Sequence, residues 1–336
     1  MQPGWVDAPH YELACGDFPL DSGEAIEDFR LSFAAHGDLA DDRLPAVAVL
    51  CAIASTHHRL DFLIGPGRAL DPARMRILAI DAIGNGLSSS PSNSTGQPGA
   101  AFPRFTVRDM VRSQKRLADH LGIARLHAVV GASMGGMQAL QWGVTYPGAV
   151  GRIVALTPMA RATAWSAAAN LAARQALQAA LDACLPGAPH PPGLWDGWSA
   201  VMQILCAQTP EQVDGQLVSP ARMRDWLAAR SAGWRAQGFD PLDWIHQSWA
   251  YDAHDVGAAD GFRGDAARAL GSIRARTLIA APPLDLYNPV HAAKWAAAHI
   301  PDCAYREIDS IAGHWMASAD AGSAAELNRL VGDFLV

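Results

Sequence analysis

Short, continuously apolar runs alternate with helical segments along most of the chain, and this alternation restricts the fold more than any other feature of the sequence. The runs that predict buried strands are 46–54, 76–83, 126–131, 152–157, 275–281 and 304–308. Strands that are apolar on both faces and separated by helices are typical of a parallel sheet covered by helices on both sides. We therefore expect an α/β fold with a mostly parallel, doubly wound sheet.

The stretch between residues 157 and 275 breaks this alternation. It is helical in pattern, rich in alanine, and holds seven of the eleven tryptophans. The simplest interpretation is that these tryptophans fill the interior of the stretch itself. In a doubly wound sheet, ligands bind at the carboxyl ends of the strands, so such an insertion is typical of a cap over the ligand crevice. We predict a core domain made of residues 1–160 and 262–336, with a helical cap (lid) at 161–261.

The composition excludes several functional classes. Of the 336 residues, 50% are hydrophobic and 18% are charged, which suits a large core and is too little charge for a disordered chain. The net charge of −7 leaves no basic stripe to meet nucleic-acid phosphates. No apolar run of membrane-spanning length is free of charges and turn-forming residues. We therefore expect neither nucleic acid nor a membrane as a partner.

The cysteines and the N-terminal region indicate the compartment. The five cysteines are scattered and include no CxxC pair, so the sequence predicts neither a disulfide framework nor a zinc site. No cluster with metal-ligand spacing is present, and we expect no metal. Residues 1–20 lack the basic start and apolar stretch of a secretory signal. A cytoplasmic, reduced protein is the expectation.

The most informative stretch is Gly131-Ala132-Ser133-Met134-Gly135, which fits the pattern G-x-S-x-G. It lies between a predicted strand and a predicted helix, which is the context of a nucleophile elbow. Such a turn holds the serine in a strained conformation that exposes its hydroxyl, and a Cβ two residues before or after would collide with backbone. The motif predicts Ser133 as a nucleophile; the alternative is a tight turn with an incidental serine.

A serine nucleophile needs a base that takes its proton and an acid that orients the base. After a nucleophile elbow, the acid comes next in the chain and the histidine follows it. Asp285 lies just past the strand predicted at 275–281, and His314 lies in a loop before the final helix. We therefore predict Ser133, Asp285 and His314 as the catalytic residues, with Asp309 as the alternative acid.

Two backbone N–H groups are expected to stabilise the oxyanion. The Met134 N–H lies at a helix N-terminus and points toward developing negative charge. The second donor should come from the loop after the first core strand, where we place it at the Ile53 N–H. The Ile53 side chain carries no chemistry of its own.

Four longer motifs are also present, and the first of them contains the elbow. They are GASMGGMQAL at 131–140, LIGPG at 63–67, TVRDMV at 106–111 and DAHDV at 252–256. Together they resemble the homoserine O-acetyltransferase family of α/β-hydrolase-fold enzymes, whose elbow reads GGSMGGMQAL. The likeness extends over nearly the whole chain. It implies an α/β-hydrolase fold with a mostly parallel, doubly wound sheet and an inserted helical cap.

The resemblance also implies roles for particular residues. The family's triad falls on Ser133, Asp285 and His314. Its cap arginine corresponds to Arg174; in the family this arginine faces the active-site tunnel and can meet a substrate carboxylate, a task that suits a bidentate guanidinium. The alternative for Arg174 is a surface charge on a cap helix. Members commonly dimerise through the cap, which implies that a homodimer can form.

Three departures separate this chain from the methionine-pathway members of the family. The family has an aspartate directly after the catalytic histidine, whereas this chain has Trp315. The oxyanion loop HALTG is replaced by CAIAS at 51–55, and GNGLSSSPSN at 84–93 is similar to the hydrolase branch. Losing a charged anchor weakens amino-acid recognition. We therefore expect the hydrolase branch, with Trp315 contacting the substrate.

The sequence is compatible with three functions. The first is a serine esterase that hydrolyses a small carboxylic ester of the acetyl type through an acyl-enzyme. The second is an O-acetyltransferase that shares this first half-reaction but uses acetyl-CoA as co-substrate and a hydroxyl compound as acceptor. Both take a small-molecule ester or acyl donor as partner and need no cofactor. The third is a catalytically silent binding protein, against which the intact Ser133, Asp285 and His314 argue.

Overall fold

The computed structural model describes residues 4–184 and 190–336, and one eight-stranded sheet forms its centre. The strand order is β1-β2-β4-β3-β5-β6-β7-β8. The strands are β1 (His10–Pro19), β2 (Ala25–His36), β3 (Ala46–Leu50), β4 (Arg76–Ile80), β5 (Leu126–Ala132), β6 (Val150–Leu156), β7 (Arg276–Ala281) and β8 (Cys303–Glu307). Strands β3 to β8 pair in parallel, whereas β1 pairs with β2, and β2 with β4, in antiparallel fashion. The predicted α/β fold with a mostly parallel sheet is confirmed.

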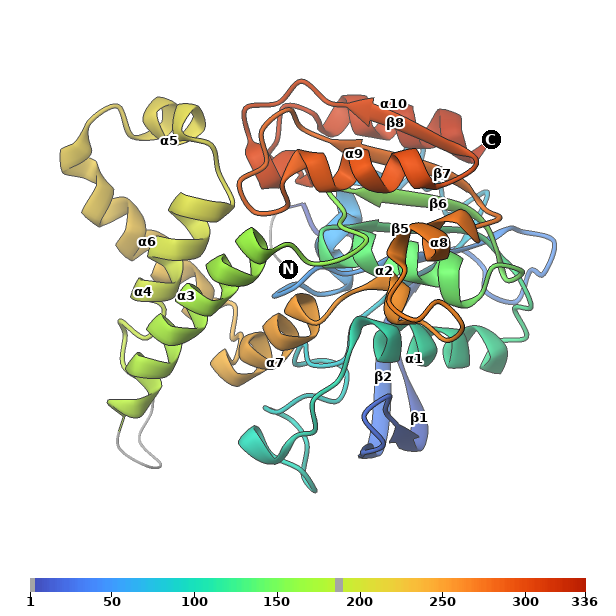
Figure 1. Cartoon of the computed structure of the whole chain (residues 1–336), viewed down its shortest axis with the longest axis horizontal. Coiled ribbons are helices and arrows are strands. Elements are labelled where there is room, and N and C mark those ends of the chain that lie inside the picture. Colours follow the sequence, from blue (N-terminus) through green and yellow to red (C-terminus); the bar gives the residue numbers. More distant parts are fainter. Residues whose placement is uncertain (1–3, 185–189) are drawn as a thin grey trace.

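Helices cover both faces of the sheet because successive residues of each central strand point to opposite sides and both sides are apolar. Val47 and Val49 of β3 pack with α10 (Ala324–Leu335), whereas Ala48 and Leu50 belong to the larger cluster on the other face. That cluster includes residues of α1 (Val107–His120), α2 (Met134–Thr145), α8 (Ala266–Gly271) and α9 (Val290–His299). Figure 1 shows α10 on one side of the sheet and α1 and α2 on the other.

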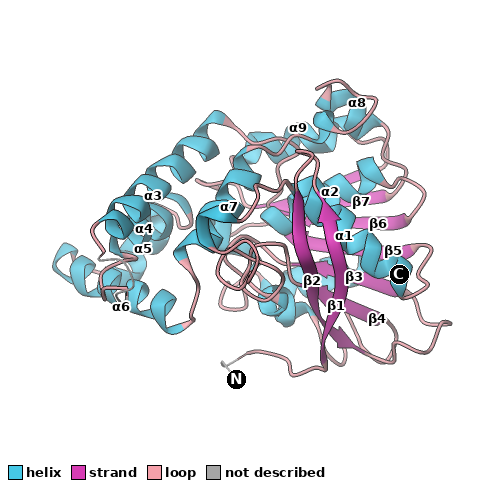
Figure 2. Ribbon diagram, turned by 90° about the horizontal axis from the view of Figure 1, so that it is seen from below, coloured by secondary structure: helices cyan, strands magenta, loops and turns pink. Residues whose placement is uncertain are grey.

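The segment between β6 and β7 contributes no strand to the sheet within its described residues. It forms α3 (Ala164–Asp182), α4 (Asp196–Ser199), a π-helical turn (Ala200–Cys206), α5 (Pro210–Leu217), α6 (Met223–Ala236) and α7 (Pro241–Asp252), with short 3-10 helices at Pro220–Arg222 and Val256–Ala258. Figures 1 and 2 show α3 to α6 beside the sheet domain, with α7 between this group and the sheet. The exact division into core and cap stays a prediction.

Tryptophans pack against one another inside the inserted segment. Trp198 lies with its ring edge-on to Trp195, Trp234 and Trp244, at centroid distances of 5.2, 4.8 and 5.6 Å. Such aromatic pairs stabilise a small helical layer beyond the simple burial of their area. Within 4–184 and 190–336, no helix has the length and apolar character needed to cross a membrane.

Candidate active site

A sharp turn joins β5 to α2 and holds Ser133 in an unusual backbone conformation, with φ 56° and ψ −121°. A Cβ on Gly131 would lie 2.1 Å from the Gly135 carbonyl oxygen, and one on Gly135 would lie 2.4 Å from the Leu50 carbonyl oxygen. Both positions therefore require glycine, since backbone atoms cannot move aside. The strained serine between them is typical of a residue held for function.

Ser133, His314 and Asp285 form a continuous chain of hydrogen bonds. The Ser133 hydroxyl lies 2.7 Å from His314 Nε2, and His314 Nδ1 lies 2.8 Å from Asp285 Oδ2. The other carboxylate oxygen, Asp285 Oδ1, accepts hydrogen bonds of 2.8 Å from the N–H groups of Tyr287 and Asn288. The structure thus brings together the three residues predicted as catalytic, and all three are buried.

The alternative acid, Asp309, does not join this chain. Its side chain is exposed, and Asp285 occupies the position next to His314 Nδ1. The Tyr287 ring lies edge-on to the His314 imidazole at 5.0 Å, so the histidine is packed as well as hydrogen-bonded. A packed, hydrogen-bonded imidazole is held in the orientation that proton transfer from a serine requires.

The two predicted oxyanion donors come from different parts of the chain. Met134 begins α2, where the first N–H groups have no partner in the helix. Ile53 lies in the turn after β3, next to Ala54, which has a positive φ of 50°. Within the described part of the chain, neither N–H donates a hydrogen bond to a protein acceptor. Both groups are therefore free to donate to a bound ligand.

A cavity of about 680 Å³ opens beside the elbow and is lined by Ser133, His314, Ile53 and Trp315. The inserted segment provides much of the wall through side chains of its helices. These include Trp198, Met202, Arg230, Trp234, Asp243 and Trp244. A cavity of this size, lined by aromatic and charged side chains, admits a small organic substrate next to the serine hydroxyl.

Trp315 and Arg174, both predicted to contact substrate, lie in different surroundings. Trp315 lines the cavity, and the Arg230 guanidinium lies over its ring at 6.0 Å. Arg174 is not among the lining residues. Its guanidinium lies 2.6 Å from Asp252 Oδ2 and donates to Ser248 Oγ at 3.0 Å. Arg174 is thus engaged by a carboxylate of its own chain, and the structure does not bring it to Ser133.

Asp243 of α7 is a cavity residue that the sequence did not single out. Its carboxylate accepts hydrogen bonds from the Ser92 N–H at 2.9 Å and the Ser92 hydroxyl at 2.6 Å. Burial raises the pKa of Asp243 to about 7, although the hydrogen bonds from Ser92 act in the opposite direction. No local pattern marks this residue, because Ser92 lies 151 positions away in the chain.

The raised pKa of Asp243 predicts a loss of stability as the pH rises. A carboxyl whose pKa is higher in the folded state stabilises the fold below its ordinary pKa, and this contribution disappears as the pH approaches about 7. The free energy of unfolding of the wild type relative to D243N should therefore fall by about 4 kcal/mol between pH 4 and 8. Urea unfolding of both proteins across this range measures the difference.

The control for this experiment is D214N, which removes an exposed carboxylate of α5. Its stability difference from the wild type should change little over the same pH range, because an exposed carboxylate is solvated in both states. A constant difference between wild type and D243N across the range would contradict the assignment of Asp243.

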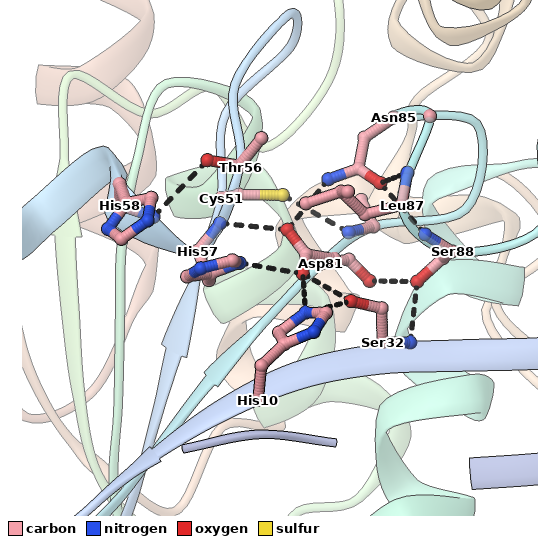
Figure 3. A network of polar contacts seen from close by, with 12 residues as sticks. His10, Ser32, Cys51, Thr56, His57, His58, Asp81, Asn85, Leu87 and Ser88 are labelled. Carbon is pink, nitrogen blue, oxygen red and sulfur yellow. Dashed lines mark hydrogen bonds and ion pairs between the residues drawn. The ribbon is translucent and has the colours of Figure 1, made fainter. Parts of the chain in front are cut away.

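Figure 3 shows a second cluster of titratable groups. His10, His57 and Asp81 of this cluster are not among the residues that line the cavity. His10, His57 and Asp81 place one potential metal-ligand atom each within 4.8 Å of one another. The sequence did not reveal this group, because its members come from β1, the 3-10 helix His57–Leu63 and the loop that follows β4. Their spacing along the chain matches no metal motif.

Hydrogen bonds already occupy these three side chains. His57 Nδ1 lies 2.9 Å from Asp81 Oδ2, which also accepts the Ser32 hydroxyl at 2.6 Å. His10 Nε2 lies 2.8 Å from Ser32 Oγ. Burial alone would raise the pKa of Asp81, but its contacts with both histidines and with Ser32 hold it well below its usual range. The donors and acceptors are complementary without an ion, which favours a structural network over a metal site.

Comparisons with known proteins place these observations among relatives. A family model described as alpha/beta hydrolase fold matches residues 64–318. A homoserine O-acetyltransferase from Methanococcoides burtonii is 28% identical over 375 residues, which cover 98% of this chain and 74% of that protein. A probable esterase from Corynebacterium glutamicum is 28% identical over 331 residues, covering 92% of this chain and 90% of that one.

A solved structure with the same arrangement of elements is an acetylester hydrolase from Corynebacterium glutamicum. It has a TM-score of 0.87 and 27% sequence identity, and the match covers 97% of this chain and 96% of that chain. The similarity therefore includes the inserted helices as well as the sheet.

Proposed function

The chain belongs to the alpha/beta hydrolase fold family, and we propose that it hydrolyses a small ester of the acetyl type through an acyl-enzyme on Ser133. It is an enzyme similar to both esterases and homoserine O-acetyltransferases. The observation that carries this proposal is the chain of hydrogen bonds from Ser133 through His314 to Asp285. Its Ser133 end lines the cavity. An activated serine beside an open cavity is suited to attack a carbonyl carbon.

In the first half-reaction, the Ser133 oxygen attacks the ester carbonyl and His314 Nε2 takes the hydroxyl proton. The carbonyl oxygen becomes an oxyanion, which the N–H groups of Ile53 and Met134 stabilise. Asp285 holds the imidazole and favours its protonated form. The intermediate then expels the alcohol, which receives the proton from His314, and leaves the acyl group on Ser133.

In the second half-reaction, a water molecule gives a proton to His314 and attacks the acyl carbon. A second tetrahedral intermediate forms at the same two N–H groups. It collapses with release of the carboxylic acid, and the proton returns from His314 to the Ser133 oxygen. Ser133, His314 and Ile53, which take part in these steps, line the cavity.

Two features support a small substrate that needs no carboxylate for binding to Arg174. Trp315 and tryptophans of the inserted segment line the cavity, so apolar surface is available for an acyl or alkyl group. Arg174, the residue proposed from the family resemblance to meet a carboxylate, is paired with Asp252. The solved relative named as an acetylester hydrolase is consistent with an acetyl group as the acyl part.

The second candidate is an O-acetyltransferase, and the similarity to a homoserine O-acetyltransferase over 98% of this chain favours it. The same acetyl-Ser133 intermediate would form from acetyl-CoA, with loss of the thiol. A hydroxyl acceptor would then replace water in the second half-reaction. The two functions therefore differ in what enters the cavity after Ser133 is acylated.

A two-substrate assay separates these functions. The purified chain is given p-nitrophenyl acetate and, separately, acetyl-CoA with homoserine, serine or a simple alcohol. Steady release of nitrophenol without an acceptor supports the esterase. Release of CoA that depends on an acceptor, with no ester hydrolysis, would refute it in favour of the transferase. Failure of both reactions and of Ser133 labelling by a fluorophosphonate would indicate a silent binding protein.

The quaternary structure and compartment stay predictions. A homodimer formed through the inserted helices is expected from the family resemblance, and light scattering during gel filtration measures the molar mass that tests it. A cytoplasmic location is expected from the cysteine pattern, and fractionation of expressing cells tests this expectation.

A further inference from the structure

The turn after β3, at residues 52–56, is closed by a hydrogen bond within it and is held at its C-terminal end by residues of the sheet domain. The Ala52 N–H donates to Ser55 Oγ at 2.8 Å, and the Ser55 carbonyl accepts from Asn85 Nδ2 at 3.2 Å. Just beyond the turn, the His57 N–H donates to Asp81 Oδ1 at 2.8 Å, a contact visible in Figure 3. The buried Asp81 network therefore anchors one end of the turn that carries Ile53.

The middle of the turn, at Ala54, is held by a residue of the inserted segment. Ala54 has a left-handed φ of 50°, which a residue with a Cβ adopts only when its surroundings compensate. Its N–H donates at 3.0 Å to the side-chain oxygen of Gln247, which belongs to α7 of the inserted segment. The two residues are 193 positions apart in the chain. An amide from the inserted segment therefore holds the strained part of the turn.

Gln247 has no freedom to satisfy this contact in another way. Its side chain is 1% exposed, and its Nε2 donates at 3.2 Å to the Ile83 carbonyl in the loop after β4. A Cβ on Gly84 would lie 3.3 Å from Gln247 Cγ, so the glycine leaves room for this approach. The amide orientation is fixed, because Ile83 requires a donor and Ala54 requires an acceptor.

We propose that Gln247 is a positioning residue that sets the direction of the Ile53 N–H, so that the inserted segment completes the oxyanion hole. The Ile53–Ala54 peptide plane is fixed by the bond to Gln247, and the Ile53 N–H belongs to the adjoining plane. A change in the first plane therefore rotates the second. This inference rests on the proposed function, in which the Ile53 N–H binds the oxyanion.

Two substitutions test the contact through different chemistry. Q247M keeps the length of the side chain and removes both hydrogen bonds. Q247E keeps the donor and the acceptor only while its carboxyl is protonated, because a protonated acid offers one carbonyl oxygen and one O–H. When the carboxyl introduced by Q247E ionises, it loses its O–H donor. A carboxylate oxygen then faces the Ile83 carbonyl oxygen with no proton between them.

We expect Q247M to lower kcat for p-nitrophenyl acetate by about 10- to 100-fold with little change in KM, because the substrate still fits and only the oxyanion is misaligned. The rate of Ser133 labelling by a fluorophosphonate should fall as well, since its phosphoryl oxygen uses the same donors. For Q247E, the ratio of its kcat to that of the wild type should decrease as the pH rises. The ratio cancels any pH dependence that both proteins share.

The matched control is S248A, which removes a buried polar group from the next position of the same helix. The Ser248 hydroxyl donates to the Ile245 carbonyl within α7 and has no contact with the turn, so kcat and the labelling rate should stay near those of the wild type. Circular dichroism confirms that each variant is folded before assay.

The outcomes distinguish this inference from the proposed function. If the wild type hydrolyses the ester through Ser133 while folded Q247M keeps the wild-type kcat and labelling rate, the positioning role is wrong. A Q247E ratio that does not change with pH would overturn it equally, even if Q247M fails to fold. If the wild type shows no acyl transfer, the proposed function fails, and the labelling rates still report on Gln247.

Discussion

S133A is expected to lower kcat for ester hydrolysis by roughly 10⁴- to 10⁶-fold, to a level set by the cavity and the oxyanion donors alone. The substitution removes the only atom that forms the covalent bond and leaves the rest of the site intact. KM should change little, because a hydroxyl of this size contributes little to ground-state binding. Nitrophenol release at high enzyme concentration measures the residual rate.

The control for this substitution is S219A, which alters an exposed serine outside the cavity lining. It should retain full activity. Thermal unfolding should be similar for wild type and S133A, since alanine removes one buried oxygen and adds no atom. Retention of more than a small fraction of activity by folded S133A would contradict a nucleophilic Ser133.

D285N is expected to lower kcat by about 10⁴-fold while leaving the fold unchanged. The remaining amide oxygen can still accept from the Tyr287 and Asn288 N–H groups. The amide nitrogen, however, presents hydrogens to His314 Nδ1, which stabilises the tautomer that carries its proton on Nε2. That tautomer cannot take the Ser133 proton, so the loss appears in kcat.

The matched control is D309N, because Asp309 is the other acid that the chain order allows. Asp309 is exposed and should be replaceable without loss. Steady-state kinetics of the two variants at one pH provide the comparison. An active D285N together with an inactive D309N would show that the hydrogen bond between His314 and Asp285 is not the one used in catalysis.

The parts of the fold that depend on local patterns were predictable from the sequence. The apolar run at 126–131 followed by G-x-S-x-G predicted the strand, the turn and the helix that hold Ser133, and β5 and α2 confirm this arrangement. The apolar run at 46–54 was predicted too long. Strand β3 ends at Leu50, because the chain then turns through the left-handed Ala54 while its residues remain apolar.

Features that depend on distant contacts had no such signal. Most residues of β1 are exposed, so no apolar run marks it. The pairing of Arg174 with Asp252 depends on how α3 and α7 pack, and a motif position cannot show which partner the guanidinium finds. The contacts of Gln247 and Asp243 with the sheet domain join residues more than 150 positions apart. Such contacts follow from tertiary packing and leave no local pattern.

Mass spectrometry of an acid-quenched reaction tests the central claim most directly. The protein is mixed with excess p-nitrophenyl acetate, quenched within the first turnover and digested. An acyl-enzyme on Ser133 predicts a burst of nitrophenol close to the enzyme concentration and one acetyl group on the peptide that contains Ser133, absent when S133A or D285N is used. Steady hydrolysis with no acetyl group on Ser133, or with the acetyl group on another residue, would contradict it.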